Sequence, residues 1–214
     1  MRVFTQLMMR AKSDYKIVNG ELVWANPNLY LEGDGEAYID TGIKTASTLK
    51  VDIEYYRVDG QPFGWTGTIS NVNKTFGYGS ASASAFARIG AWYVTNNTAW
   101  ANETWLNLHM ERGLSNSTIN GVKFSNQSGT QNTFSDGGSM AIFVYAGSNT
   151  LTPMTGKIKY FKVYDGDTLL IHLVPVPKDM VIGNFVVPSN GMFDIVSQTF
   201  FGNVSTGAFG YGKV

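Results

Sequence analysis

Hydrophobic and polar residues alternate along short stretches of this chain, most clearly from Leu49 to Tyr56. An apolar or aromatic residue occupies every second position there, and the positions between them are mostly charged. Alternation with a period of two predicts a β-strand with one buried face and one solvated face. The segment from Trp105 to Glu111 repeats the pattern, with Leu106, Leu108 and Met110 on the buried side.

Glycine-containing turns separate the apolar runs. Asn19-Gly20 and Asn120-Gly121 each join two such runs. They predict hairpins with type I′ turns, because both turn positions require a positive φ angle. Met140 to Tyr145 is an unbroken apolar run, which predicts a central strand buried on both faces. The chain shows about a dozen short strands, and the spacing of the turns is typical of a β-sandwich or barrel.

The late part of the chain predicts two strands joined by a tight turn. Gly156 to Tyr164 alternates but slips in phase at Tyr160-Phe161, which indicates a β-bulge. Asp165-Gly166-Asp167 then turns the chain into a strand from Leu169 to Val174. We expect Pro175 and Pro177 to end that strand, because proline cannot donate a hydrogen bond to a neighbouring strand.

The pattern predicts one all-β domain preceded by a short extension. The extension, residues 1–29, holds the first hairpin and ends at Asn26-Pro27-Asn28, which breaks the chain. Residues 30–214 show no shift of composition that would mark a second domain and no repeat of fixed period. A chain of 214 residues is long enough to bury a substantial core as a single sandwich.

Composition and charge narrow the classes of function. The 16 basic and 16 acidic residues balance, which argues against a nucleic-acid partner because phosphate binding requires a basic surface. Hydrophobic residues make up 43% of the chain, which argues against a disordered protein. There is no cysteine for a disulfide, and no apolar stretch approaches the roughly 20 residues of a membrane span. Met1 to Lys12 lacks the apolar centre of a signal peptide, so a protein that works outside the cell would be a trimmed chain or would leave the cell inside a particle.

Four segments form a set that occurs in order along the chain. Tyr30 to Ile43, the opening stretch, combines a glycine turn with Tyr-Ile-Asp-Thr-Gly-Ile. Trp105 to Val122 is a hairpin with an Asn-Gly turn, Lys157 to Tyr164 is a late strand, and Thr206 to Phe209 closes the set. Together they resemble the concanavalin A-like (laminin-G-like) jelly-roll domains of bacteriophage and gut-bacterial proteins. The resemblance covers residues 30–210 and implies a jelly-roll β-sandwich of two antiparallel sheets.

The resemblance implies a non-enzymatic bacteriophage virion surface protein that decorates a head or tail and binds glycans for adhesion to host or mucus. Its implied partners are other virion structural proteins and surface glycans, and homo-oligomers are frequent in this class. Phage members often carry a basic, methionine-rich segment before the domain, so residues 1–29 are predicted to attach the protein to the particle. The predicted attachment residues are Arg2, Phe4, Leu7, Met8 and Arg10. A carbohydrate-binding module of a bacterial cell surface is the alternative, and a glycosidase of this fold is a third.

Candidate catalytic and metal-binding groups are sparse, and we predict no catalytic residue, metal site or cofactor. Retaining glycosidases of this fold place Glu-x-Asp-x-x-Glu on one strand, whereas Asp52 and Glu54 lack the third carboxylate. Two histidines are too few for a histidine metal site; we interpret His109 as a surface residue and His172 as a satisfied core or edge residue. Calcium is an alternative at aspartates in glycine-rich turns, where turn formation is the favoured interpretation. These aspartates are Asp34, Asp40, Asp136, Asp165 and Asp167.

Aromatic residues gather between positions 65 and 105 among several asparagines. An aromatic plane can stack on the apolar face of a sugar ring while amides bond its hydroxyls. The alternative is that these rings fill the core between two sheets. Trp105 lies on the outward phase of its strand, which favours an exposed position. The predicted ligand-binding residues are Trp65, Tyr78, Trp92, Trp100, Asn102 and Trp105.

Overall fold

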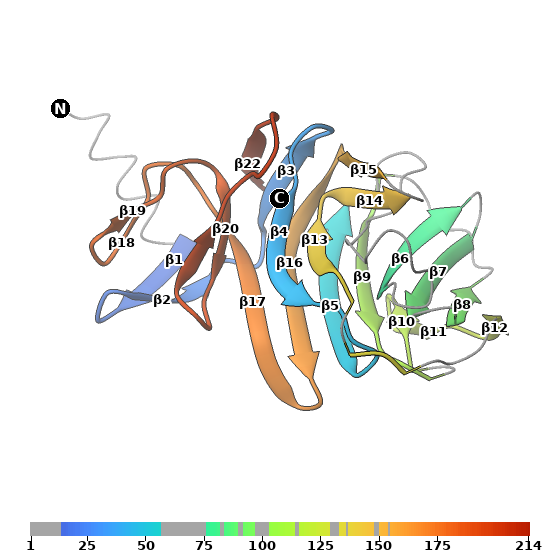
Figure 1. The fold of residues 1–214 in the computed structure, drawn as a ribbon. Coiled ribbons are helices and arrows are strands. Elements are labelled where there is room, and N and C mark those ends of the chain that lie inside the picture. The colour runs from blue at the N-terminus through green and yellow to red at the C-terminus, as the bar shows by residue number, and fades with distance from the viewer. Residues whose placement is uncertain are drawn as a thin grey trace.

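The fold is given by a computed structural model that describes most of the chain (Figure 1). The described backbone comprises residues 14–56, 76–81, 84–89, 92–96, 103–113, 116–128, 133–135, 137–147, 150–153 and 155–214. Side chains are described for the same residues except those within 76–88, 92–96, 126–128 and 145–152. The elements defined in these ranges are all β-strands, so the predicted all-β class is confirmed.

The main sheet is organised around β16 (Thr155–Asp165). The strand β5 (Leu49–Tyr56) pairs antiparallel with β16 along one edge. The other edge is shared, because β3 (Leu29–Asp34) pairs with residues 155–158 and β17 (Thr168–Val176) pairs with residues 161–165. Within the described residues the sheet continues with β9 (Trp105–Met110), β10 (Thr118–Ile119) and β11 (Val122–Lys123) beyond β5, β20 (Gly191–Asp194) and β21 (Thr199–Phe201) beyond β17, and β22 (Phe209–Lys213) beyond β3.

The other described strands form smaller antiparallel sheets. They are the pairs β1 (Tyr15–Val18) and β2 (Glu21–Ala25), β4 (Ile39–Lys44) and β13 (Ser139–Ile142), β14 (Val144–Gly147) and β15 (Thr150–Pro153), β18 (Val181–Ile182) and β19 (Phe185–Val186), and the sheet of β6 (Phe76–Ala81), β7 (Ser84–Ile89), β8 (Trp92–Asn96) and β12 (Asn126–Ser128). Figure 1 shows β4 and β13 in front of β16 and β5, and residues of all four strands share one core. This layering of antiparallel sheets is consistent with a β-sandwich.

The alternation that predicted β5 and β9 is confirmed. Every second residue of β5, beginning with Leu49, is buried, and the residues between them are half-buried. In β9 the side chains of Leu106, Leu108 and Met110 are buried. The outward residues of both strands therefore lie on the face of the main sheet that is turned away from the core.

Both Asn-Gly hairpins are confirmed. Strand β1 pairs with β2, and β10 pairs with β11. The φ angles are 51° at Asn19 and 85° at Gly20, and 49° at Asn120 and 78° at Gly121. Positive φ at both central positions is the geometry of a type I′ turn, whose twist matches that of the strands it joins.

The predicted bulge in β16 is confirmed, one residue before the position that the phase slip indicated. The register against β5 shifts between Ile158 and Tyr160, so Lys159 is the inserted residue. Ile158 and Phe161 are buried, while Lys159 and Tyr160 between them are only half-buried. The bulge thus turns two consecutive side chains to the same outward face, which a regular strand cannot do.

The prediction of one central strand over Met140 to Tyr145 is wrong. Phe143 has a φ of 63°, and this left-handed position divides the run into β13 and β14. β13 pairs with β4 and β14 pairs with β15, so neither lies in the main sheet. Residues 140–144 are nevertheless all buried, because this segment covers the core of the main sheet.

Of the two prolines predicted to end this strand, Pro175 does not end it, whereas β17 does end directly before Pro177. The strand continues to Val176, and Pro175 pairs with Met192 of β20. The pairing of β17 with β16 stops at Leu173, so the missing N–H of Pro175 interrupts no ladder on that side. The carbonyl of Pro175 instead accepts a hydrogen bond of 2.9 Å from the Tyr15 hydroxyl.

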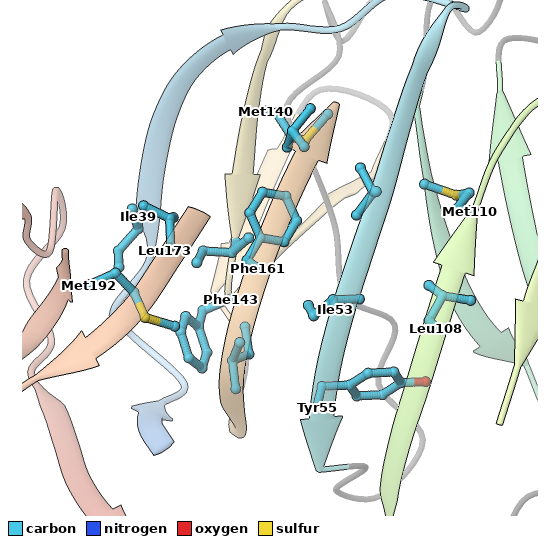
Figure 2. Packing of buried hydrophobic residues seen from close by; sticks show 14 of the residues in the cluster. Ile39, Ile53, Tyr55, Leu108, Met110, Met140, Phe143, Phe161, Leu173 and Met192 are labelled. Atoms are coloured by element: carbon cyan, nitrogen blue, oxygen red, sulfur yellow. The ribbon is translucent and has the colours of Figure 1, made fainter. Parts of the chain in front are cut away.

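The main core lies between the main sheet and the β4–β13 pair. Figure 2 shows Ile53 of β5, Phe161 of β16 and Leu173 of β17 on the side that also holds Ile39 of β4 and Phe143. All five are buried. Complete burial of one such side chain stabilises the fold by about 1.5–3 kcal/mol, so this cluster holds the layers together.

A second buried cluster joins residues 14–29 to the C-terminal strands. Leu22 and Leu29 pack there with Phe193 of β20. The Tyr211 hydroxyl lies 2.5 Å from that of Tyr15, which itself donates to β17. Burial raises the pKa of both tyrosines, to about 12 for Tyr211, so both hydroxyls stay protonated at neutral pH. The described part of the predicted N-terminal extension is therefore packed on the rest of the protein.

Asp34 joins the opening stretch to the closing segment. Its Oδ1 accepts hydrogen bonds from the backbone N–H groups of Glu36 and Ala37, and its Oδ2 accepts one of 2.7 Å from Ala208. These bonds, first of all that from Ala208, lower the pKa of the Asp34 carboxyl below its ordinary value. A Cβ at Gly207 would lie 2.6 Å from both the Ala37 nitrogen and Asp34 Oδ1, so glycine is required at this contact.

Gly207→Ala is expected to destabilise the protein by about 1–3 kcal/mol, because the added methyl group overlaps the backbone of Ala37. Gly210→Ala is the matched control, since its nearest contact is the Glu32 Cβ at an ordinary 3.4 Å. Urea unfolding measures the difference between the two variants. Equal stability of both would contradict the close packing of the closing segment.

Candidate functional site

The main sheet has an outward face that is rich in aromatic and charged residues, called the outer face below. The strands that supply it are β3, β5, β9 and β16, whose other faces are buried in the core. Its described residues are half-buried, apart from the exposed Asn107. They are Tyr30, Glu32, Lys50, Asp52, Glu54, Tyr56, Trp105, Asn107, His109, Lys157, Lys159, Tyr160, Lys162 and Tyr164.

Three aromatic rings converge at one end of the outer face. Trp105 pairs with Tyr56 across β9 and β5, and their ring centroids are 5.4 Å apart in an edge-to-face arrangement. The Tyr30 ring from β3 lies 6.0 Å from the Trp105 ring. These separations are those of favourable aromatic contacts, so the three rings form one cluster although they come from three strands.

Two lysines of β16 lie among these rings. The Lys157 ammonium is 4.9 Å from the ring centre of Tyr30 and 5.2 Å from that of Tyr56. The Lys159 ammonium is 4.4 Å from the ring centre of Trp105. Such cation–π contacts stabilise by about 0.5–2 kcal/mol each, more where water is excluded. Because of the bulge, Lys159 and the next residue, Tyr160, both lie on this face.

Strand β22, which pairs with β3 beside Tyr30, places only glycines on the outer face. Gly210 pairs with Glu32 and Gly212 pairs with Tyr30, so both glycines share the outer face. A Cβ at Gly212 would lie 2.5 Å from the Cζ atom of Tyr30, which shows that the Tyr30 ring lies against this glycine. Gly212 is thus a positioning residue for the aromatic cluster, and the backbone of β22 is accessible next to it.

Hydrogen-bonding groups lie along the rest of the outer face. The Asn107 Nδ2 donates to the Tyr160 hydroxyl at 3.1 Å. His109 Nδ1 is 2.6 Å from Asp52 Oδ1. This bond to Asp52 is the main cause of a raised pKa at His109, against the opposing effect of burial. At Tyr160, in contrast, burial raises the pKa. The hydroxyl therefore stays protonated and available as a hydrogen-bond donor.

This arrangement suits a ligand with an apolar face and a polar rim. A pyranose ring has such a shape, with axial C–H groups on its faces and hydroxyls around its edge. The aromatic cluster offers planar apolar surface, while Asn107, Tyr160 and the carboxylates offer donors and acceptors at a short distance along the sheet. The charged groups of this face contact one another, which holds the rings and amides in place before a ligand arrives.

Trp105 is the predicted ligand-binding residue that the structure places in this site. Tyr78 lies in β6 and Trp92 in β8, whose side chains are outside the described residues. Trp65, Trp100 and Asn102 also lie outside the described residues. The same is true of the predicted attachment residues Arg2, Phe4, Leu7, Met8 and Arg10.

The site contains residues that the sequence interpretation missed. The sequence pattern assigns Tyr30 only to a fold motif and the two lysines only to a strand. The alternation of β5 did place Tyr56 on the outward phase, which was a usable signal. His109 lies on the outward phase as predicted, although it is half-buried and bonded rather than freely solvated.

Two aspartates of the glycine-rich turns, Asp34 and Asp40, accept backbone hydrogen bonds within their own turns. Asp40 Oδ1 accepts a hydrogen bond from the backbone N–H of Gly42 at 2.9 Å and another from the Ser139 hydroxyl. Asp34 has the backbone partners given above. Asp165 and Asp167 flank the turn between β16 and β17, while Asp136 lies outside the described residues. In the described part of the chain, no three histidine or acidic side chains are arranged to hold a metal ion.

No protein-family model matches the chain, and no curated protein is significantly similar to it in sequence. The resemblance to concanavalin A-like domains therefore rests on the four quoted segments. Among the described residues there is no helix with the length and apolarity that a membrane crossing requires.

The two histidines are expected to titrate in opposite directions from the ordinary pKa of about 6.5. Asp52 raises the pKa of His109, whereas burial lowers that of His172 to about 4. NMR titration of the two imidazole rings measures both values. Asp52→Asn should lower the pKa of His109 and leave the pKa of His172 unchanged. If the pKa of His109 stayed the same in that variant, the result would contradict the charged Asp52–His109 contact.

Proposed function

We propose that this chain is a non-enzymatic bacteriophage virion surface protein that binds glycans through the outer face of its main sheet. The observation that carries the binding proposal is the cluster of Tyr30, Tyr56 and Trp105 beside amide and hydroxyl groups. Rings of this kind provide much of the binding energy in interfaces where they are held in place by their neighbours. The virion part of the proposal is supported by the resemblance of the quoted segments.

The finer fold assignment belongs to the same proposal. We assign the chain to the concanavalin A-like jelly rolls, with the main sheet as one layer and the β4–β13 pair within the other. The contact of Asp34 with Ala208 supports this, because the opening and closing segments of the resemblance meet in space. In such a sandwich a broad sheet face is open to a ligand, and the outer face is that surface here.

The absence of enzymatic activity is proposed from the state of the carboxylates. Asp52 is bonded to His109 at 2.6 Å, and Glu54 is bonded to Lys159 at 2.7 Å. Each of these carboxylates thus already has a close partner, whereas a glycosidase needs an acid and a nucleophile or base that are free to act on the sugar. This supports binding of glycans without hydrolysis.

Attachment to the particle is proposed for the end of the molecule that holds the N-terminal hairpin. The hairpins β1–β2 and β18–β19 meet at their turns, where Gly20 lies against Gly183. Figure 1 shows both hairpins beyond β17, at the opposite end of the molecule from β9. They carry seven of the twelve exposed large hydrophobic residues in the described part of the chain, which supports a protein contact surface there. These residues are Ile17, Val18, Val23, Trp24, Val181, Phe185 and Val186.

Trp105→Ala is expected to weaken glycan binding at least about tenfold, because it removes the ring at the centre of the cluster. Trp24→Ala is the matched control, since Trp24 is 45% exposed on β2 and lies outside the outer face. Binding to a printed glycan array, followed by calorimetry on the best sugar, measures both variants. If Trp24→Ala weakens binding as much as Trp105→Ala, the sugar binds elsewhere.

A truncated chain tests whether residues 1–13, which precede the hairpins, contribute to attachment. Removal of residues 1–13 spares Tyr15, Leu22 and Leu29, which are buried, whereas removal of 1–29 would open the second core. We expect the full chain in purified particles and the truncated chain to be depleted from them at least about tenfold. Mass spectrometry of particles and of cell envelopes measures this. Equal incorporation would exclude attachment through residues 1–13, and a full chain found only in envelopes would favour the bacterial cell-surface module.

A further inference from the structure

The lysines among the aromatic rings are each neutralised by a carboxylate on the same face. Lys159 Nζ lies 2.7 Å from Glu54 Oε1, and Lys157 Nζ lies 3.6 Å from Glu32 Oε1. Both carboxylates come from strands that flank β16, so the sheet register creates the pairs. The aromatic cluster therefore contains two positive and two negative charges, which cancel at short range.

We propose that Glu32 and Glu54 are specificity-determining residues that restrict the outer face to neutral glycans and reject acidic ones. This inference rests on the proposed glycan binding. Lysines beside a sugar site ordinarily attract the carboxylate or sulfate groups of acidic sugars. Here an incoming anion would meet a lysine that already has a partner, and it would approach that partner's negative charge. Rejection by like charge is a common means of discriminating between related ligands.

The burial of the Lys159–Glu54 pair strengthens the restriction. The Lys159 side chain is 10% exposed and that of Glu54 is 23% exposed. Lys159 cannot turn toward a ligand without leaving Glu54 as an unpaired, largely desolvated charge, which is strongly unfavourable. Its ammonium also contacts the Trp105 ring, so the same movement would disturb the stacking surface.

Most other charged residues of the described outer face are also paired with an opposite charge. His109 is paired with Asp52, and Lys50 lies 3.6 Å from Glu111. Lys162 is the exception within this described face, because its ammonium lies over the Tyr160 ring at 5.2 Å. Lys162 is paired across the sheet with Asp52, whereas Lys157 is paired with Tyr56, so Lys162 lies away from the aromatic cluster. A neutral ligand at the cluster therefore meets a surface without net local charge.

The test compares the full chain with Glu32→Gln, Glu54→Gln and the double variant. The probes are neutral oligosaccharides (glucan, mannan, galactan and N-acetylglucosamine oligomers) and acidic ones (polygalacturonate, sialylated and sulfated oligosaccharides). We expect the unmodified chain to bind a neutral probe at least about tenfold more tightly than any acidic probe. The double variant should gain at least about tenfold in affinity for acidic probes, and added salt should reverse the gain because the freed lysines act through charge.

Glu111→Gln is the matched control, because it removes one of the two carboxylates that lie 3.6 Å from Lys50, the other being Asp167, at the far end of the outer face, and it should leave the selectivity unchanged. Glu32→Gln keeps the test decisive if the Glu54 variants misfold. The Glu32 side chain is 42% exposed, so its replacement should leave the fold intact. An unmodified chain that prefers acidic probes would overturn this inference and leave glycan binding intact. Gln variants that stay selective for neutral probes would also overturn it. If no probe binds the unmodified chain, the proposed function fails, and this inference fails with it.

Discussion

The structure depends on the double pairing of β16. One edge of this strand is paired along most of its length with β5, and the other is divided between β3 and β17. The division brings the opening stretch and the C-terminal strands into one sheet. The bulge at Lys159 lies in the same strand. It allows Ile158 and Phe161 to stay in the core while Lys159 and Tyr160 face outward. Core packing and the chemistry of the outer face are thus set by one strand.

Stability and proposed function are separated between parts of the molecule. The closing contact of Asp34 with Ala208 and the bonded tyrosines of the second cluster tie the chain ends to the sheet. The aromatic cluster lies on strands whose other face is buried, so its rings rest on a rigid support. The apolar hairpins lie beyond β17, where contacts with another protein would leave the outer face free.

Much of the local structure could be predicted because it depends on short-range rules. Period two defined β5 with its observed limits, and Asn-Gly defined both hairpins. Two predictions failed where tertiary contacts prevailed. Phe143 takes a left-handed conformation within an apolar run, and Pro175 continues a strand whose pairing with β16 has already ended. Neither the fold of the run nor the position of the strand edge is visible in the local pattern.

The sequence by itself determined the all-β class, the turns, and the outward phase of Tyr56, Trp105 and His109. It also determined the low and balanced charge of the chain. Only the tertiary structure decided that Tyr30 meets Trp105 and that Glu32 and Glu54 neutralise the two lysines. The physical reason is that alternation assigns each residue a face, whereas the pairing of distant strands decides which residues on that face become neighbours.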